Sequence, residues 1–240
     1  MQAIDYGRAR RLLARRDPIL RDLMRRHGAC GLAAAQRSDP FRALCHAIIA
    51  QQLSTKAAAT IEARFSGLFA GHPTPATVAR ASDEQLRAVG LSPQKLRYMR
   101  DLCGKILDGS LELNDLDALS DDDVIAALTS VKGIGRWTAE MFLIFRLHRP
   151  DVLPVDDLGI LKAVQRAYRL RLTPTPARLT KIGEAWRPYR SVACWYLWAS
   201  LDNAPLPPKA PAPPSPKAPA RLAKALNEGG PIKATKEQRT

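Results

Sequence analysis

The 240-residue sequence is poor in the patterns that β-structure, membrane spans and secretion require. It has no alternating run of apolar and polar residues and no Asn-Gly turn, so β-hairpins are not expected. No stretch of 18 apolar residues occurs, which argues against a membrane span. The basic N-terminus lacks the apolar segment and the small-residue cleavage site of a secretory signal, so we expect a cytoplasmic protein.

Residues that bind metal ions are also few and scattered. No two of the four cysteines (Cys30, Cys45, Cys103 and Cys194) stand at a metal-chelating spacing. The four histidines are isolated from one another and from any carboxylate pattern that would complete a metal site. We therefore expect no zinc site, no iron–sulfur cluster and no side-chain metal site, and free thiols in a reducing compartment.

Positive charge is abundant. The formal net charge is +14 and the isoelectric point is about 10.1. Residues 204–240 hold seven basic and two acidic residues, so +9 of this charge belongs to residues 1–203. A basic protein favours a polyanionic partner, nucleic acid before a membrane, and a nucleoid-associated location if the protein is bacterial. A basic surface that only confers solubility is the alternative.

The composition changes after Ala204. Nine of the nineteen prolines follow it, interleaved with alanine and lysine. Such a segment cannot form an apolar core, so we expect a folded domain over residues 1–203 and a disordered basic tail over 204–240. We hypothesise that the tail adds salt-sensitive DNA affinity. A solubilising extension without another role is the alternative.

Helix-start signals recur along residues 1–203. Asp, Ser or Thr stands directly before Pro at Asp17, Asp39, Thr74, Ser92 and Thr175, which is typical of an N-cap followed by the first helical residue. Apolar residues then recur at helical spacing, which indicates an all-α fold. The expected helices are Tyr6–Arg15, Pro18–His27, Phe41–Ala50, Thr55–Phe69, two short helices opened by Thr74 and Ser82, Pro93–Leu107, Asp121–Leu128, Arg136–Leu147, Asp157–Tyr168, Ala177–Trp186 and Tyr189–Leu201.

A glycine hairpin precedes the helix expected over Arg136–Leu147, which is apolar nearly all round. It runs from Val131 to Gly135, with Gly133 and Gly135 one residue apart. Glycine permits positive φ and leaves backbone N–H groups uncovered, and the helix that follows begins with free N–H groups. This arrangement predicts an anion site for one phosphate, with Lys132 and Arg136 adding positive charge.

The hairpin and a later acidic pair together resemble a known family. KGIGRWTAEMF followed by LPVDDLGILK is similar to the helix-hairpin-helix DNA glycosylases, in the alkylpurine branch of DNA-3-methyladenine glycosylase II. The resemblance covers about residues 17 to 202. It implies two helical lobes, one over about residues 53–147 and one from 1–52 plus 148–203, with DNA and a flipped base between them. It also implies a monomer that binds double-stranded DNA containing damaged bases.

In this family an Asp after the hairpin is the catalytic carboxylate, and the alignment gives that role to Asp157. Cleavage of an N-glycosidic bond builds positive charge on the sugar, which a carboxylate can stabilise while it orients a water. An alkylated purine is already cationic and leaves without a strong acid, and nothing in the motif suggests a second positioned acid. The alternative is that Asp156 and Asp157 only cap a helix, and we expect Asp156 to be the cap.

The resemblance also implies a pocket and a mode of cleavage. Relatives that cut the DNA backbone carry a Schiff-base Lys two residues after the second hairpin glycine, where this chain has Trp137. We therefore expect a monofunctional enzyme, with Trp137 attracting a cationic base through its π face unless it is a core residue. Trp198 matches an aromatic pocket position, and Met141 stands where the family's bacterial inducible enzyme has an aromatic. Trp195 has no such match and is expected in the core.

A flipped base leaves a gap in the duplex that a side chain must fill. Gln51, Gln52, Leu53 and Ser54 stand between two expected helices and resemble the family's wedge loop. We assign the plug to Gln52 and a second role as helix cap to Ser54, with an ordinary helix–helix turn as the alternative. By resemblance alone, the carbonyls of Val131 and Gly133 are candidate ligands for K⁺ or Na⁺, and no other cofactor is expected.

These observations lead to one main interpretation and three alternatives. The main one is a monofunctional DNA glycosylase that flips and excises alkylated purines (3-methyladenine, 7-methylguanine) in base excision repair. A glycosylase for another lesion, such as hypoxanthine, would share the same fold. A non-catalytic helix-hairpin-helix DNA-binding protein would not need Asp157 or the Gln51–Ser54 loop. A lyase-type endonuclease is disfavoured by Trp137 and by the absence of a cysteine cluster.

Overall fold

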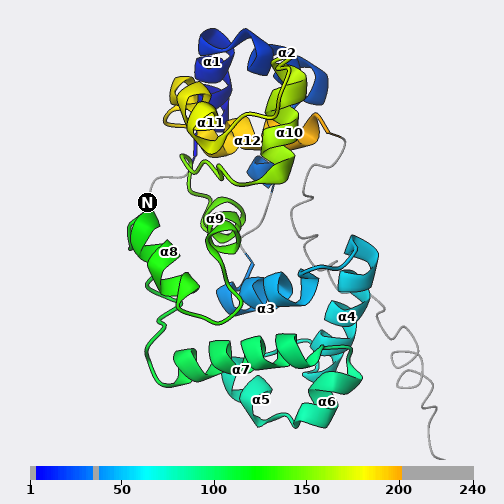
Figure 1. Ribbon diagram of the computed structural model, residues 1–240. Coiled ribbons are helices and arrows are strands. Elements are labelled where there is room, and N and C mark those ends of the chain that lie inside the picture. The colour runs from blue at the N-terminus through cyan, green and yellow to red at the C-terminus, as the bar shows by residue number, and fades with distance from the viewer. Residues whose placement is uncertain (1–3, 35–37, 202–240) are drawn as a thin grey trace, which may run out of the picture. The chain divides into compact units, whose positions relative to one another are not determined.

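The computed structural model describes residues 4–34 and 38–201 (Figure 1), so the proposed tail over 204–240 lies outside the described residues. Within these ranges every regular element is a helix, which confirms the all-α prediction. No helix in this part of the chain is both long and apolar enough to cross a membrane. The elements are α1 (Tyr6–Arg16), α2 (Pro18–His27), η1 (Gly31–Ala34), α3 (Pro40–Ala50), α4 (Thr55–Leu68), α5 (Pro75–Arg80), α6 (Asp83–Ala88), α7 (Pro93–Leu107), α8 (Asp121–Thr129), α9 (Arg136–Phe145), α10 (Leu158–Ala167), α11 (Pro176–Gly183), η2 (Glu184–Trp186) and α12 (Arg190–Ala199), where η1 and η2 are 3₁₀ helices.

The expected N-caps start their helices as predicted. The side chains of Asp17, Asp39, Ser92 and Thr175 each accept a hydrogen bond from a backbone N–H in the first turn, and Pro follows each of them. Each such bond pairs one of the N–H groups that a helix start leaves without a partner. The expected helix over residues 177–186 was wrong in one respect, because it divides into α11 and the 3₁₀ helix η2.

The helix contacts fall into two sets in the described residues. Helix α3 packs on α4, α7 and α9, while α7 also packs on α5 and α6, and α8 packs on α9. Helix α12 packs on α1, α2, α10 and η1. The division into lobes stays a prediction, although these contacts place α3 with the helices that follow it in sequence.

Helix α12 lies at the centre of the second set. Every residue from Ser191 to Ala199 is buried, so this helix is covered on all sides. Trp195 is 8% exposed and packs edge-on against Tyr196, which confirms its expected place in the core. Gly31 permits this packing, because a Cβ at that position would lie 2.7 Å from the Trp195 ring.

A buried carboxylate joins the N-terminal helices to the C-terminal ones. Asp17 is 6% exposed, and its Oδ1 caps α2 by accepting from the N–H groups of Ile19 and Leu20. Its Oδ2 accepts from Trp186 Nε1 at 2.9 Å and from the Tyr168 hydroxyl. Burial and this carboxylate raise the pKa of Tyr168, so the phenol stays protonated and continues to donate.

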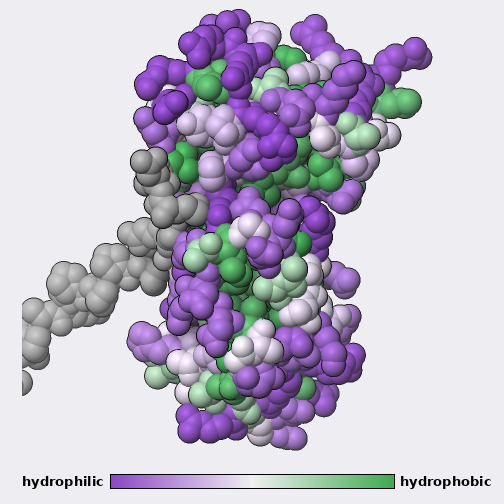
Figure 2. All heavy atoms as spheres, turned by 90° about the vertical axis from the view of Figure 1, so that its left-hand side faces the viewer, coloured by the Kyte–Doolittle hydropathy of each residue, from purple (hydrophilic) through white to green (hydrophobic). Residues whose placement is uncertain are grey.

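The four cysteines are free thiols, and all are buried. Burial raises the pKa of Cys30 to about 12 and raises that of Cys45 as well, so neither is a reactive thiolate at neutral pH. Outside the core, the face drawn in Figure 2 is covered mainly by hydrophilic side chains, with hydrophobic ones in smaller groups.

Candidate active site

Asp157 is a buried carboxylate at the start of α10. Its side chain is 7% exposed, and Oδ1 accepts from the backbone N–H of Ile160 at 2.7 Å. Asp157 is therefore itself the N-cap of α10, and our prediction that Asp156 is the cap was wrong. The helix begins at Leu158, so the residue directly before it is the one placed to cap, and Asp156 is left exposed in the preceding turn.

Two indole N–H groups also donate hydrogen bonds to this carboxylate. Trp198 Nε1 donates to Asp157 Oδ1 at 2.9 Å, and Trp137 Nε1 donates to Asp157 Oδ2 at 2.6 Å. Hydrogen bonds to an ionised group are shorter and stronger than neutral ones. Gly159 leaves room for this arrangement, because a Cβ there would lie 3.0 Å from Asp157 Oδ1. Three N–H donors thus fix the orientation of the carboxylate.

The two tryptophans differ in what they offer a ligand. Trp137 is 50% exposed, so half of its surface is accessible to solvent while its indole N–H donates to Asp157. Trp198 is 4% exposed and packs on Phe145, with ring centroids 5.7 Å apart. Trp137 can therefore contact a base directly, whereas Trp198 mainly holds the carboxylate. Met141 lies one turn after Trp137 on α9 and is partly buried against the core.

Two apolar residues near the carboxylate did not enter the sequence-based prediction. Phe145 continues the spacing of Trp137 and Met141 on α9, so this helical stripe could have identified it. Leu158 follows Asp157 directly as the first residue of α10, and it is 70% exposed. An exposed leucine beside a buried carboxylate had no sequence signal, because its exposure depends on how α10 packs.

Glu140 is a second buried acidic group that the sequence did not single out. It is 5% exposed, and its Oε1 accepts from Arg136 Nε at 3.0 Å. Burial raises the pKa of the Glu140 carboxyl, the nearby Arg136 opposes this shift, and the charges of Asp156 and Asp157 add to it. A second carboxyl group therefore lies within electrostatic reach of Asp157.

The glycine hairpin, which we define as Val131–Gly135, is held tightly against α7. Gly133 has φ +82°, and a Cβ there would lie 2.2 Å from the Tyr98 ring, so only glycine fits. Gly135 caps α9 without a side-chain hydrogen bond, which leaves the first N–H groups of α9 open to an anion.

Two cations, Lys132 within the hairpin and Arg136 directly after it, both have carboxylate partners. Lys132 donates its backbone N–H to Asp101 Oδ2 at 2.9 Å, and its ammonium lies 3.7 Å from Asp101 Oδ1. Arg136 pairs with Glu140, as described above. Their side chains are 75% and 61% exposed, so both remain accessible to a phosphate.

The residues Gln51–Ser54, which we call the wedge loop, connect α3 to α4. Ser54 caps α4 by accepting from Ala57 N at 3.3 Å, which confirms that part of its expected role. Gln52 is exposed with φ +57°, and Leu53 is 38% exposed, so both side chains are accessible at the tip of the loop.

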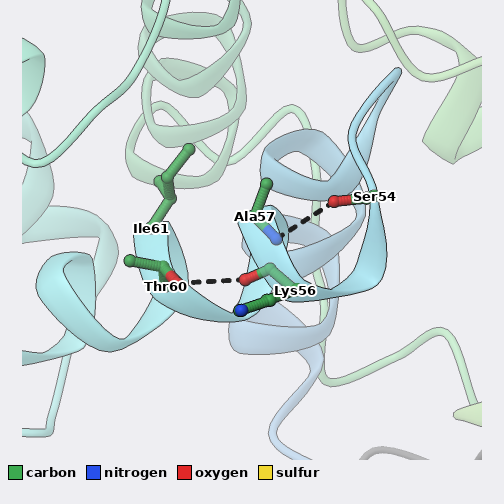
Figure 3. Close-up of a pocket in the computed structure, with 5 residues that line it drawn as sticks. All are labelled: Ser54, Lys56, Ala57, Thr60 and Ile61. Atoms are coloured by element: carbon green, nitrogen blue, oxygen red, sulfur yellow. Dashed lines mark hydrogen bonds between the residues drawn. The ribbon is translucent and has the colours of Figure 1, made fainter.

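Beside the wedge loop lies an open hollow of about 410 Å³ on α4 (Figure 3). Ala57, Thr60 and Ile61 line it together with Ser54 and Lys56, and none of the residues around Asp157 takes part. The hollow is therefore separate from the carboxylate site.

The wedge loop and the hairpin are in direct contact. Gln51 Nε2 donates to the carbonyl of Gly133 at 2.7 Å, and Ile134 N donates to the carbonyl of Val131 at 3.1 Å. Each of these two carbonyls keeps a second lone pair, so a K⁺ or Na⁺ ligated by Val131 and Gly133 stays compatible with the geometry.

Comparison with known proteins gives consistent matches. Residues 45–188 match the HhH-GPD superfamily of base excision DNA repair proteins. DNA-3-methyladenine glycosylase 1 of Schizosaccharomyces pombe is 37% identical over 166 residues, which are 68% of this chain and 73% of the relative. The crystal structure of a DNA-3-methyladenine glycosidase from Bacillus halodurans has a TM-score of 0.69 at 37% identity, covering 78% of this chain and 86% of that one. The Schizosaccharomyces pombe 3-methyladenine DNA glycosylase bound to abasic DNA has a TM-score of 0.69 at 33% identity, covering 81% of this chain and 97% of that one.

Proposed function

The chain belongs to the HhH-GPD superfamily of base excision DNA repair proteins, and we propose that it excises alkylated purines such as 3-methyladenine and 7-methylguanine from double-stranded DNA. One observation carries this proposal. Asp157, which the resemblance aligns with the family's catalytic carboxylate, is buried and is oriented by N–H donors from Ile160, Trp137 and Trp198. The names of the relatives, which refer to 3-methyladenine, support the choice of lesion.

In the proposed reaction, water hydrolyses the N-glycosidic bond. The bond between C1′ and the base nitrogen breaks, and its electron pair leaves with the base. Asp157 stabilises the positive charge that develops on the sugar, orients the water that adds to C1′, and accepts its proton. The half-exposed indole ring of Trp137 attracts the cationic base by about 0.5–2 kcal/mol. Because the base is already cationic, it departs without a general acid.

We propose that the enzyme is of the DNA-3-methyladenine glycosylase II type and has no lyase activity. Strand cleavage through a Schiff base needs an amine at the sugar, and Trp137 occupies the place where lyase relatives carry lysine. An indole nitrogen that donates to Asp157 has no basic lone pair to attack C1′. The product would be an intact strand with an abasic site.

DNA is proposed to bind across the hairpin and the wedge loop. The N–H groups of Gly133 and Gly135 would hold one phosphate, with Lys132 and Arg136 adding charge. Gln52, exposed at the tip of the wedge loop, would fill the gap left by the flipped base. The protein is proposed to act as a monomer, with K⁺ or Na⁺ at the hairpin carbonyls as an optional structural ion.

The test is release of bases from methylated DNA by the wild type, Asp157→Asn and Asp156→Asn. We expect the wild type and Asp156→Asn to release 3-methyladenine and 7-methylguanine, Asp157→Asn to release neither, and strands to break only after alkali. Release by Asp157→Asn would move the catalytic role to another residue. Strand cleavage without alkali would contradict the absence of lyase activity. Release of hypoxanthine from an inosine-containing duplex, without release of either methylated base, would assign a different lesion.

A further inference from the structure

The wedge loop and the hairpin lie 82 positions apart in sequence and are joined by one side chain. Gln51 is the C-cap of α3, with φ −51° and ψ 128°, and its amide reaches the carbonyl of Gly133 at 2.7 Å. We propose that Gln51 is a positioning residue that couples the wedge loop to the hairpin, so that phosphate binding holds Gln52 in place for base flipping. This inference rests on the proposed function.

The geometry assigns Gln51 a role different from the DNA contact that the sequence predicted. One N–H of its amide is committed to Gly133, and the side chain is only partly exposed. Its neighbours Gln52 and Leu53 are exposed at the loop tip. Contact with DNA therefore falls to the tip, while Gln51 links the base of the loop to the protein.

Helix α7 supports both ends of this link. Lys95 Nζ donates to the carbonyl of Ile49 at 2.7 Å, in the last turn of α3 before the wedge loop. Three residues further along α7, the Tyr98 ring packs under Gly133, and three residues further again Asp101 accepts the N–H of Lys132. Residues at this spacing lie on neighbouring positions of one helix surface. The wedge loop and the hairpin thus share one support as well as a direct bond.

The coupling matters because the loop tip has an unfavourable backbone conformation. Gln52 has φ +57°, a region that residues with a Cβ rarely adopt. Such a conformation persists only where the surroundings fix it, and the residue directly before Gln52 is the one held by the hairpin. Loss of the Gln51 bond would let the tip relax, so the plug would enter the duplex less often although phosphate binding is unchanged.

The experiment compares the wild type with Gln51→Ala, Gln51→Asn, Gln52→Ala and the double variant Gln51→Ala/Gln52→Ala. Flipping of a tetrahydrofuran abasic nucleotide, together with entry of the plug, is followed by the fluorescence of 2-aminopurine placed opposite or beside it. Affinity for this abasic-site duplex, affinity for an undamaged duplex and thermal unfolding are measured in parallel. None of these signals requires excision, so the coupling can be judged even if the enzyme removes another lesion than the one proposed.

We expect Gln51→Ala to lower the flipping equilibrium about three- to tenfold, the range expected for loss of one hydrogen bond. Its affinity for undamaged DNA should change less than twofold. Gln51→Asn, one methylene too short to reach Gly133, should behave like Gln51→Ala. The double variant should match Gln52→Ala alone, because Gln51 acts through the plug.

Three results would overturn the proposal. One is a wild-type flipping signal in both Gln51 variants. Another is a double variant whose defect is the product of the two single defects, which would mean that Gln51 acts independently of Gln52. The third is an equal loss of affinity for damaged and undamaged DNA, which would make Gln51 a simple DNA contact.

Discussion

Replacing Asp157 by Asn is expected to destabilise the protein as well as inactivate it. Removal of a catalytic charge often stabilises an enzyme, because active sites hold strained or poorly paired groups. Here the carboxylate accepts three hydrogen bonds, from Ile160 N and Trp198 Nε1 on one oxygen and from Trp137 Nε1 on the other. An Asn amide has only one oxygen. If that oxygen keeps the first two bonds, the NH₂ group faces the Trp137 N–H and loses the third.

The magnitudes follow from these bonds. Loss of one bond to a charged group, with the remaining two no longer charge-assisted, lowers the free energy of unfolding by about 2 kcal/mol. Asp157→Ala also loses the helix cap and leaves the buried Trp198 N–H without an acceptor, so its loss is about 4 kcal/mol. For a domain of this size these values lower Tm by roughly 6 and 12 °C. Excision by both variants should fall by at least about 100-fold.

Calorimetry and single-turnover excision on the same preparations test whether Tm falls less in Asp157→Asn than in Asp157→Ala while both variants lose activity. Asp156→Asn is the matched control, because Asp156 is exposed and adjacent, and it should keep the Tm and most of the activity. A Tm of Asp157→Asn equal to or above that of the wild type would refute the reasoning. It would mean that the three N–H groups do not stabilise the carboxylate as their distances indicate.

Three further predictions concern groups around the site. Gly133→Ala should lower Tm and weaken DNA binding, since its Cβ would lie 2.2 Å from the Tyr98 ring at φ +82°, and Tyr98→Ala in the same chain should restore part of the Tm. The His46–Glu62 pair raises the pKa of His46, chiefly through their hydrogen bond, so its stabilisation is present below pH 6.5 and is lost as pH rises through the higher folded pKa. His46→Gln should lack this pH dependence, which urea denaturation of the variant and the wild type at pH 6 and pH 8 would show. The difference should be below about 1 kcal/mol, because both side chains are exposed to water. Burial raises the pKa of Glu140 above 4.5, so its contribution to the free energy of unfolding falls as pH rises through the folded pKa. In Glu140→Gln, the free energy of unfolding measured in urea should therefore depend less on pH between pH 4.5 and neutrality.

Helix starts were the part of the fold that the sequence predicted best. The side chains of Asp17 and Thr175 accept hydrogen bonds from backbone N–H groups no more than three residues later, and a helix tolerates proline only in its first turn. The signal for a helix start is therefore local in sequence. The error at Asp156 has the same origin, because two consecutive carboxylates can both cap. Which of them does so depends on where the preceding loop turns into the helix.

The site was predictable only as far as its motif. The positions of Trp137 and Asp157 followed from the resemblance, but not their hydrogen bond, since it joins residues 20 positions apart through packing of α9 and α10. The same holds for Gln51 and Gly133. Glu140 escaped notice because a glutamate on a helix is ordinarily exposed, and only the fold reveals that it is buried.

The buried carboxylate of Asp17 has a consequence for the newly made chain. Two of its partners, Tyr168 and Trp186, stand 151 and 169 positions later in the sequence. At about 5–20 residues per second, a ribosome would need roughly 8–34 s to reach the second of them. During that interval α1 and α2 cannot bury their apolar faces against α12, and the Asp17 carboxylate lacks two of its hydrogen-bond donors, so this segment is made well before its contacts can be completed.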